Sequence, residues 1–312
     1  MSKSNSPCDH VEVKMDDNRI ALLRQMREKN SHYKGMLDFF EPIFEERKQY
    51  VESLTTCPDL CIKDDPVYQM RHHEGFPILT KDDIPADNPI ITDYFLKLAK
   101  IIKAQASSEP DMLDAIIQKK RDFCFESLIG HDFHKAPSIP DNAMIEFLID
   151  ETLGPVLKIY SKKLKHCMNA HVWSEGFCPV CGKQPAFALL NADDGKRTLV
   201  CAACSFEWEF KRIKCAFCGN EDQRLLSYLM VEHEDMYRIE TCNGCRRYLK
   251  TIDLKNATHE IECDVESIIT LHLDIVANNH GYFNSRRQAP RRNSNTNKLF
   301  WVVPNKTEPD KL

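Results

Sequence analysis

The sequence predicts an α+β protein of several domains, with an all-α N-terminal domain, two four-cysteine modules in tandem and a C-terminal helix. Two observations carry this prediction. Apolar residues recur at three-to-four-residue intervals through the first half of the chain, as they do in amphipathic helices. Eight of the fourteen cysteines then form four Cys-x-x-Cys pairs in the second half, namely Cys178/Cys181, Cys201/Cys204, Cys215/Cys218 and Cys242/Cys245.

The N-terminal domain is expected to consist of short helices that cross one another. Its apolar positions group into four segments on otherwise charged sequence. These segments are residues 20–51, 90–106, 111–129 and 141–165. Asp141 follows Pro140 and is a suitable N-cap for the last segment. Residues 55–89 are rich in Pro and Asp, which predicts a long connection.

The character of the sequence changes near His171, where glycines and cysteines become frequent and strand-like runs precede the cysteine pairs. After Cys263 the apolar spacing again predicts an amphipathic helix. The predicted organisation is a disordered terminus at 1–15, a helical domain at 16–170, a first module at 171–212, a second module at 213–263, a C-terminal helix at 264–283 and a basic, mobile tail at 284–312.

Composition narrows the class of protein. With 312 residues, 42% of them hydrophobic, and a net charge of −5, the chain is expected to be a soluble globular protein without an overall electrostatic footprint for nucleic acid. The first 18 residues are polar, so we do not expect a secretory signal, and no apolar stretch approaches the roughly 18 residues of a membrane span. So many cysteines outside a small secreted protein favour metal ligation in a reducing compartment, which predicts a cytoplasmic location.

The cysteine spacing predicts two metal sites. A Cys-x-x-Cys turn aims two thiolates at one ion, and a glycine after the second cysteine can take the positive φ that such a turn often needs. Gly182 and Gly219 occupy that position. If the first pair joins the second and the third joins the fourth, each unit has the layout of a zinc ribbon or rubredoxin, and the two units form an internal duplication with a period of about 40 residues. All eight paired cysteines are therefore candidate ligands.

The spacing leaves the metal open. Four thiolates in a tetrahedral array suit zinc and also iron in either common oxidation state. Zinc would be structural, whereas iron would allow one-electron chemistry tuned by N–H···S hydrogen bonds and solvent exposure.

The residues between the cysteine pairs carry a resemblance to the FdhE family, the formate dehydrogenase accessory proteins. The matching elements are Trp173, Cys178-Pro-Val-Cys181-Gly, Pro185, Arg197, Leu199, Glu207-Trp208, Arg212, Tyr228, Glu240-Thr-Cys242, Tyr248-Leu-Lys250, Leu273-Asp274 and Gly281-Tyr282. Together they cover roughly residues 171–283, and the helical part is more loosely similar. Two features depart from the family pattern: Glu266-Ser267 stands where an acidic pair is common, and the Arg- and Asn-rich tail has no counterpart.

The resemblance implies a helical region followed by two rubredoxin-like modules that each hold iron through four thiolates, with zinc as the alternative. It further implies a cytoplasmic, chaperone-like protein that is needed to assemble active formate dehydrogenase. Such a protein contacts the catalytic subunit of that enzyme before the subunit is exported by the twin-arginine route. A monomer and a homodimer both remain open.

A partner-binding surface is expected beside the cysteines. The residues that we assign to it are Trp208, Arg212, Glu240, Tyr248, Lys250 and Asp274. Core packing is the competing interpretation for Trp208 and Tyr248, because modules this small have few residues from which to build a core. A solvated surface pair is the competing interpretation for Arg212, Glu240 and Lys250.

Other functions have weaker sequence support. No serine-centred elbow, phosphate-binding glycine loop or His-Glu-x-x-His helix is present, so we expect a binding protein and not an enzyme. A zinc-ribbon protein that binds nucleic acid through its ribbon loops and basic tail is one alternative, although the acidic net charge argues against nucleic acid as a partner. A redox donor during sulfur or selenium insertion is another. Cys57-x-x-x-Cys61 with His72-His73, and His131-x-x-His134, fit loops or surfaces better than metal sites.

Overall fold

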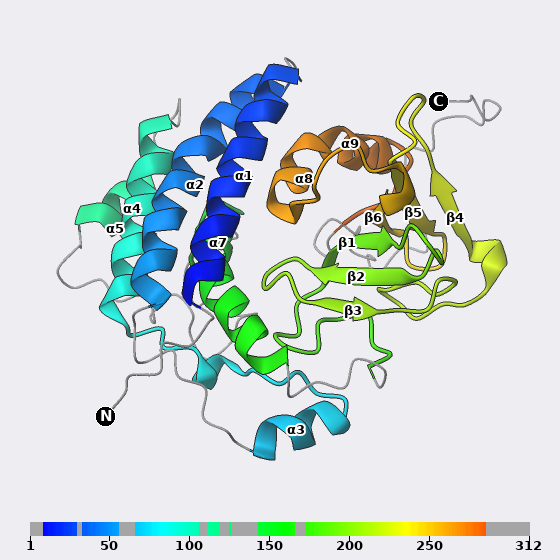
Figure 1. Ribbon diagram of the computed structural model, residues 1–312, viewed down its shortest axis with the longest axis horizontal. Coiled ribbons are helices and arrows are strands. Elements are labelled where there is room, and N and C mark those ends of the chain that lie inside the picture. The colour runs from blue at the N-terminus through cyan, green and yellow to red at the C-terminus, as the bar shows by residue number, and fades with distance from the viewer. Residues whose placement is uncertain are drawn as a thin grey trace, which may run out of the picture.

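The computed structural model describes residues 9–29, 33–55, 66–105, 111–118, 125, 143–165 and 173–284. A group of helices from the first half of the chain stands beside a six-stranded sheet from the second half, and two C-terminal helices lie over the sheet (Figure 1). The predicted fold class, with helices first and the four-cysteine region after them, is confirmed.

The N-terminal helices form because each carries an apolar stripe that packs on the others. They are α1 (Asp9–Lys29), α2 (Lys34–Thr55), α4 (Pro89–Gln105), α5 (Asp111–Gln118) and α7 (Ala143–Leu164). Leu23, Ile43 and Phe95 are among the fully buried side chains of their shared core. Helix α1 begins at Asp9, inside the segment expected to be a disordered terminus. The predicted helix at 111–129 is described only as far as Gln118 and at the single residue 125.

The predicted long connection at 55–89 contains more structure than its composition indicated. It includes α3 (Pro66–His73) and the 3₁₀ turn η3 (Lys81–Asp83). Beyond α3, the backbone N–H groups of Ile78 and Leu79 donate to the carbonyl oxygens of Pro179 and Val180 at 2.9 and 2.8 Å. Both side chains are buried, so two apolar residues within a polar segment attach it to the first cysteine pair.

The two predicted modules share one sheet and are not separate bodies. The strands are β1 (Pro185–Leu190), β2 (Arg197–Cys201), β3 (Glu207–Glu209), β4 (Leu226–Leu229), β5 (Tyr237–Cys242) and β6 (Arg247–Asp253), in the spatial order β3-β2-β1-β6-β5-β4. All neighbours are antiparallel except β1 and β6, which pair in parallel at the centre, from Phe187↔Lys250 to Leu190↔Asp253. The seven-residue strand β6 pairs with β5 on one side and with β1 on the other.

The predicted C-terminal helix is divided in two, α8 (Cys263–Ile269) and α9 (Leu271–Asn279). At Thr270 the backbone leaves helical geometry, with φ −106° and ψ 19°, and its buried hydroxyl donates to the Glu266 carbonyl oxygen at 2.5 Å. The Thr270 backbone N–H donates to the same oxygen at 3.1 Å, and α9 begins at the next residue. Back-bonding of a threonine hydroxyl to the carbonyl four residues earlier often bends a helix. Leu273 and Ala277 of α9 then pack on Ile239 of β5.

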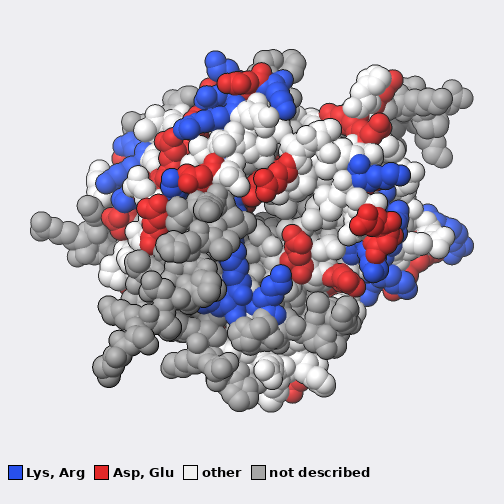
Figure 2. Space-filling view, viewed as in Figure 1, with Lys and Arg blue, Asp and Glu red and all other residues white. Residues whose placement is uncertain are grey.

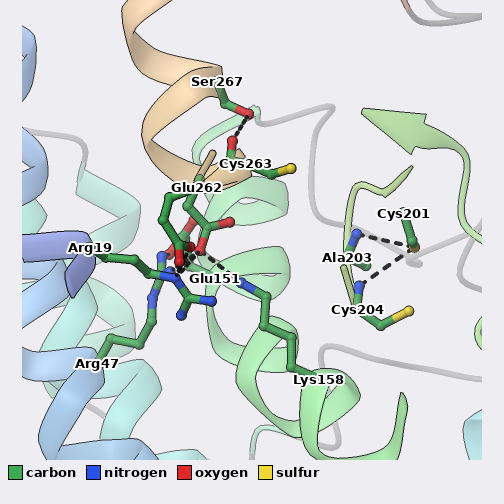
Figure 3. A network of polar contacts seen from close by, with 11 residues as sticks. Arg19, Arg47, Glu151, Lys158, Cys201, Ala203, Cys204, Glu262, Cys263 and Ser267 are labelled. Atoms are coloured by element: carbon green, nitrogen blue, oxygen red, sulfur yellow. Dashed lines mark hydrogen bonds and ion pairs between the residues drawn. The ribbon is translucent and has the colours of Figure 1, made fainter. Parts of the chain in front are cut away.

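A network of charged side chains joins α8 to the N-terminal helices (Figure 3). Asp264 accepts hydrogen bonds from Arg47 Nη1 and Lys158 Nζ, both at 2.7 Å. Arg19 Nε donates to Glu262 at 2.9 Å, and Arg47 also contacts Glu151. Residues from four helices therefore meet at one buried cluster, which connects the helical part to the sheet.

Elsewhere the charges are interspersed. Basic and acidic side chains both occur across the face shown in Figure 2, in keeping with the small net charge. Among the helices that the structure describes, none is long and apolar enough to cross a membrane.

Candidate metal centres

The four cysteine pairs meet in two groups of four. The sulfur atoms of Cys178, Cys181, Cys201 and Cys204 lie within 4.8 Å of one another, and so do those of Cys215, Cys218, Cys242 and Cys245. The predicted pairing of the first pair with the second, and of the third with the fourth, is confirmed.

The sulfur spacing fits a tetrahedral metal ion. A metal–sulfur bond of about 2.3 Å places the sulfurs of a regular tetrahedron about 3.8 Å apart. In the first group the Cys178–Cys204 and Cys181–Cys201 Sγ pairs are both 3.4 Å apart. In the second group the Cys215–Cys245 and Cys218–Cys242 pairs are 3.7 and 3.8 Å apart. Each group therefore surrounds a space of the size that one zinc or iron ion needs.

A shared turn geometry aims each pair inward. The N–H of Gly182 donates to the Cys178 carbonyl oxygen at 2.9 Å, and that of Gly219 to the Cys215 carbonyl oxygen at 3.0 Å. Both glycines have φ of 72°, as predicted from their position. The same bond and a positive φ recur after the other two pairs, at Ser205 (φ 54°) and Arg246 (φ 60°). Neither position is a glycine, because a residue with a side chain tolerates this conformation at a modest cost, so glycine placement could not predict these two turns.

Backbone N–H groups point at the sulfurs as well. They belong to Val180, Ala203, Cys204 and Phe217, and they lie 3.4 to 3.5 Å from the first cysteine sulfur of their own turn. Such bonds stabilise thiolates and tune a bound metal.

The two groups differ in burial. Cys178, Cys201 and Cys204 belong to the main core, whereas Cys218 is exposed and Cys245 is partly exposed. Burial raises the pKa of the Cys178 and Cys204 thiols well above the usual value. Four thiolates crowded in this environment are costly without a cation, so the donor set fits a bound metal ion.

Aromatic side chains support the first group. Trp173 Nε1 donates to the Phe177 carbonyl oxygen at 2.8 Å, and Trp208 Nε1 donates to the Glu175 carbonyl oxygen at 3.1 Å. Trp208 is almost fully buried. These bonds fix the segment that leads into Cys178.

Three of the residues assigned to a partner surface form an internal network. Tyr248 Oη donates to Asp274 at 2.6 Å, and Lys250 Nζ donates to the same carboxylate at 2.9 Å. Tyr248 and Lys250 are buried, so this network attaches α9 to β6.

Of the remaining assigned residues, Arg212 and Glu240 line a cavity of about 380 Å³ beside the second cysteine group, and Trp208 does not. Arg212 Nη1 donates to the Gly195 carbonyl oxygen at 2.8 Å, and Glu240 pairs with Arg197 at 2.6 Å and with Arg238 at 3.0 Å. Arg238 and Arg247 also line this cavity, and the sequence did not predict them as part of the site. Strand alternation could have found Arg238, because it shares a face of β5 with Glu240.

The remaining cysteines and histidines add no metal group among the described residues. Cys263 is partly buried near the start of α8, and burial raises its pKa. His72 is buried and stacks on Trp173 with ring centroids 5.3 Å apart. Cys57, Cys61, Cys124, Cys167, His131, His134 and the basic tail from residue 285 lie outside the described residues.

Comparisons with known proteins agree with this architecture. Residues 177–212 match the model of the FdhE central domain, and residues 213–290 match that of the FdhE C-terminal domain. The chain is 28% identical to an FdhE homolog of Aquifex aeolicus over 279 residues, which cover 86% of this chain and 92% of the relative. It is 33% identical to an FdhE homolog of Pseudomonas aeruginosa over 118 residues, about a third of each protein.

The fold is similar to a solved structure over nearly the whole chain. The crystal structure of the FdhE protein from Pseudomonas aeruginosa matches with a TM-score of 0.60 and 21% identity, over 89% of this chain and 95% of the other. At that identity the likeness concerns the fold.

Proposed function

The chain belongs to the FdhE family of formate dehydrogenase accessory proteins, and on that premise we propose that it binds the catalytic subunit of a formate dehydrogenase during assembly. The binding takes place in the cytoplasm, before the subunit is exported, and it assists maturation without catalysing a reaction. The observation that carries this proposal is that both four-cysteine groups lie inside the matched domains and assemble in the fold.

The eight paired cysteines hold one metal ion in each group, iron by preference, with zinc as the alternative. Bound metal would couple ligation to folding of the two turns, and iron would add one-electron chemistry. The sulfur spacing and the N–H···S contacts support metal binding but suit both ions.

The partner surface is centred on the cavity beside the second cysteine group. Arg212 and Glu240 line this cavity. Trp208, Tyr248 and Lys250 are buried, so they contribute to partner binding by stabilising the fold that carries the surface. Cys215 and Cys242 of the second group line the same cavity, which supports a partner surface beside the second group and not beside the first.

Co-purification tests the proposed partner. The tagged chain is expected to retain the catalytic subunit of formate dehydrogenase from cells in which both are expressed. A Cys242→Ser/Cys245→Ser variant breaks the second group and is expected to retain less. Formate dehydrogenase activity that is unchanged in a strain lacking this protein would refute the proposed function.

Metal analysis of anaerobically purified protein tests the metal assignment. Two iron ions per chain, with thiolate-to-iron absorption in the visible spectrum, are expected. Two zinc ions per chain and no such absorption would replace iron with zinc and leave the partner proposal standing.

A further inference from the structure

The cavity beside the second cysteine group lies on the face of the sheet that α9 does not cover. On β5, Ile239 packs on α9, and the alternating neighbours Arg238 and Glu240 therefore face the other side. The turn that begins the second group closes the cavity from one direction, through Cys215 and Phe217. Its volume of about 380 Å³ is within the usual range of ligand sites.

The lining carries a surplus of positive charge. Its five cationic side chains are Arg197, Arg212, Lys214, Arg238 and Arg247. Glu240 is the only acidic residue among the described residues of the lining. A divalent ion held by four thiolates next to the cavity would add only two negative charges. The five cations therefore outnumber the negative charges of Glu240 and of a metal–thiolate group together.

Two of these cations also keep unused hydrogen-bond donors. Within the described part of the chain, Nε of Arg197 and Nε of Arg238 are buried without a hydrogen-bond partner. The Arg197 side chain is 2% exposed; its other polar contacts are with Glu240 and two backbone carbonyl groups, and its guanidinium lies over the Phe210 ring. Buried donors without acceptors are costly, and an acceptor that enters the cavity would offset that cost.

Apolar groups stand at the exposed side of the same cavity. Tyr228 is 60% exposed and Ile213 is 44% exposed, and both line it. Tyr228 lies on β4, the last strand of the sheet, which pairs only with β5 among the described strands. An edge strand can accept an extended peptide, and neighbouring pockets then select its side chains.

We propose that this cavity binds an acidic segment of a partner polypeptide, whose carboxylates pair with Lys214 and Arg238 while an apolar side chain packs on Tyr228 and Ile213. The inference rests on the proposed function in that it needs a protein partner, and it adds the chemistry by which the partner is recognised. Complementary charge speeds encounter and sets specificity, which suits transient binding of a client.

Peptide binding to the metal-loaded full chain tests the inference. The probe is a short fluorescein-labelled peptide of Glu, Asp, Leu and Ser, followed by anisotropy, and the comparison peptide carries Gln and Asn in place of the acids. The acidic peptide is expected to bind more weakly as salt is raised, and the amide peptide is expected not to bind. Equal binding of the two peptides, or binding of neither, would overturn the inference.

Two variants locate the site. Lys214→Gln/Arg238→Gln is expected to weaken binding of the acidic peptide roughly tenfold or more, since each side chain loses a charged hydrogen bond. Lys196→Gln/Lys255→Gln removes the same charge from exposed positions outside the cavity and is expected to bind as the parent does. Lys214→Gln alone changes one partly exposed side chain and so tests the same site with less disturbance of the fold. Equal weakening by the two double variants would refute the location.

A second matched pair tests the apolar contact. Tyr228→Ala is expected to weaken peptide binding severalfold, whereas Ile275→Ala, at another exposed apolar side chain, is expected to leave it unchanged. The metal content of every variant must equal that of the parent. Peptide binding that follows metal content and not the substituted side chain would contradict the inference.

The inference and the proposed function fail separately. If the catalytic subunit co-purifies but the acidic peptide does not bind, the inference falls and the proposed function stands. If the peptide binds at the cavity but the subunit does not co-purify, the proposed function falls. If citrate binds at the cavity and the peptide does not, the site takes free carboxylates and the peptide proposal is wrong.

Discussion

Asp264 is the position where a single change should most clearly separate the helical part from the sheet. Its carboxylate accepts hydrogen bonds from Arg47 and Lys158 at 2.7 Å, and Arg19 Nε lies 3.7 Å away. The three cationic side chains are only 6 to 9% exposed. Asp264→Asn keeps the shape of the side chain and removes its negative charge. Glu262 and Glu151 are then the remaining carboxylates of the network that can pair with the three cations.

The expected loss is large because the cations are buried. Removing one partner from a buried ion pair costs about 3 to 5 kcal/mol, mostly as the penalty for the charge that is left uncompensated. The exposed ion pair of Asp194 and Lys196 provides the matched control, and Asp194→Asn is expected to leave stability unchanged. Adding Lys158→Met to Asp264→Asn should recover part of the loss, since it removes one of the uncompensated cations.

The same residue predicts a pH dependence. Burial alone would raise the pKa of Asp264, but Lys158, Arg47 and Arg19 hold it well below the usual range. A group whose folded-state pKa is lowered contributes its full stability above its unfolded pKa of about 3.9, and the contribution declines as the pH falls towards the folded value. The difference between the parent and Asp264→Asn should therefore be constant from about pH 5 to 8 and should shrink below about pH 4.

Urea unfolding of the metal-loaded proteins, followed by circular dichroism, measures both effects. Parent and variant are compared at each pH, so that any acid-driven loss of metal common to both cancels. A difference below about 1 kcal/mol at pH 7, the size expected of an exposed pair, would show that the network does not hold the two parts together.

Three further predictions concern the metal groups and α9. A chromogenic chelator should remove metal in two phases, and the second group should lose its metal first because Cys218 is exposed. The Cys242→Ser/Cys245→Ser variant, in which the second group is broken, should show only the slow phase. Loss of the slow phase in that variant would reverse the predicted order. Gly176→Ala should lower the metal content and stability, because its Cβ would lie 1.7 Å from the Ala216 carbonyl oxygen, whereas Gly35→Ala, with open space around it, should not. Tyr248→Phe should lower the free energy of unfolding by about 1 to 2 kcal/mol, because the partly buried Asp274 loses a donor; no change in urea unfolding would count against that bond.

Local patterns made the helices and the metal groups predictable. A cysteine turn is complete within five residues, so its two sulfurs and the positive φ of Gly182 or Gly219 can be inferred from spacing. Apolar periodicity likewise indicated α4 and α7, since one helix face must be buried. The break between α8 and α9 escaped this reasoning, because it occurs at the single residue Thr270 and leaves the apolar pattern continuous.

The sequence did not predict which residues far apart in the chain contact one another in the fold. Trp208, Tyr248 and Lys250 matched a family pattern, and only the structure places them in the interior. The sequence by itself determined two four-thiolate groups behind a helical region, because ligand spacing and periodicity act over a few residues. The tertiary structure decided that β1 and β6 fuse the two modules, that Asp264 meets Arg19 and Arg47, and that arginines from β2, β5 and β6 converge on one cavity. Such contacts form only when the hydrophobic core brings distant segments together, and no local pattern encodes which segments those are.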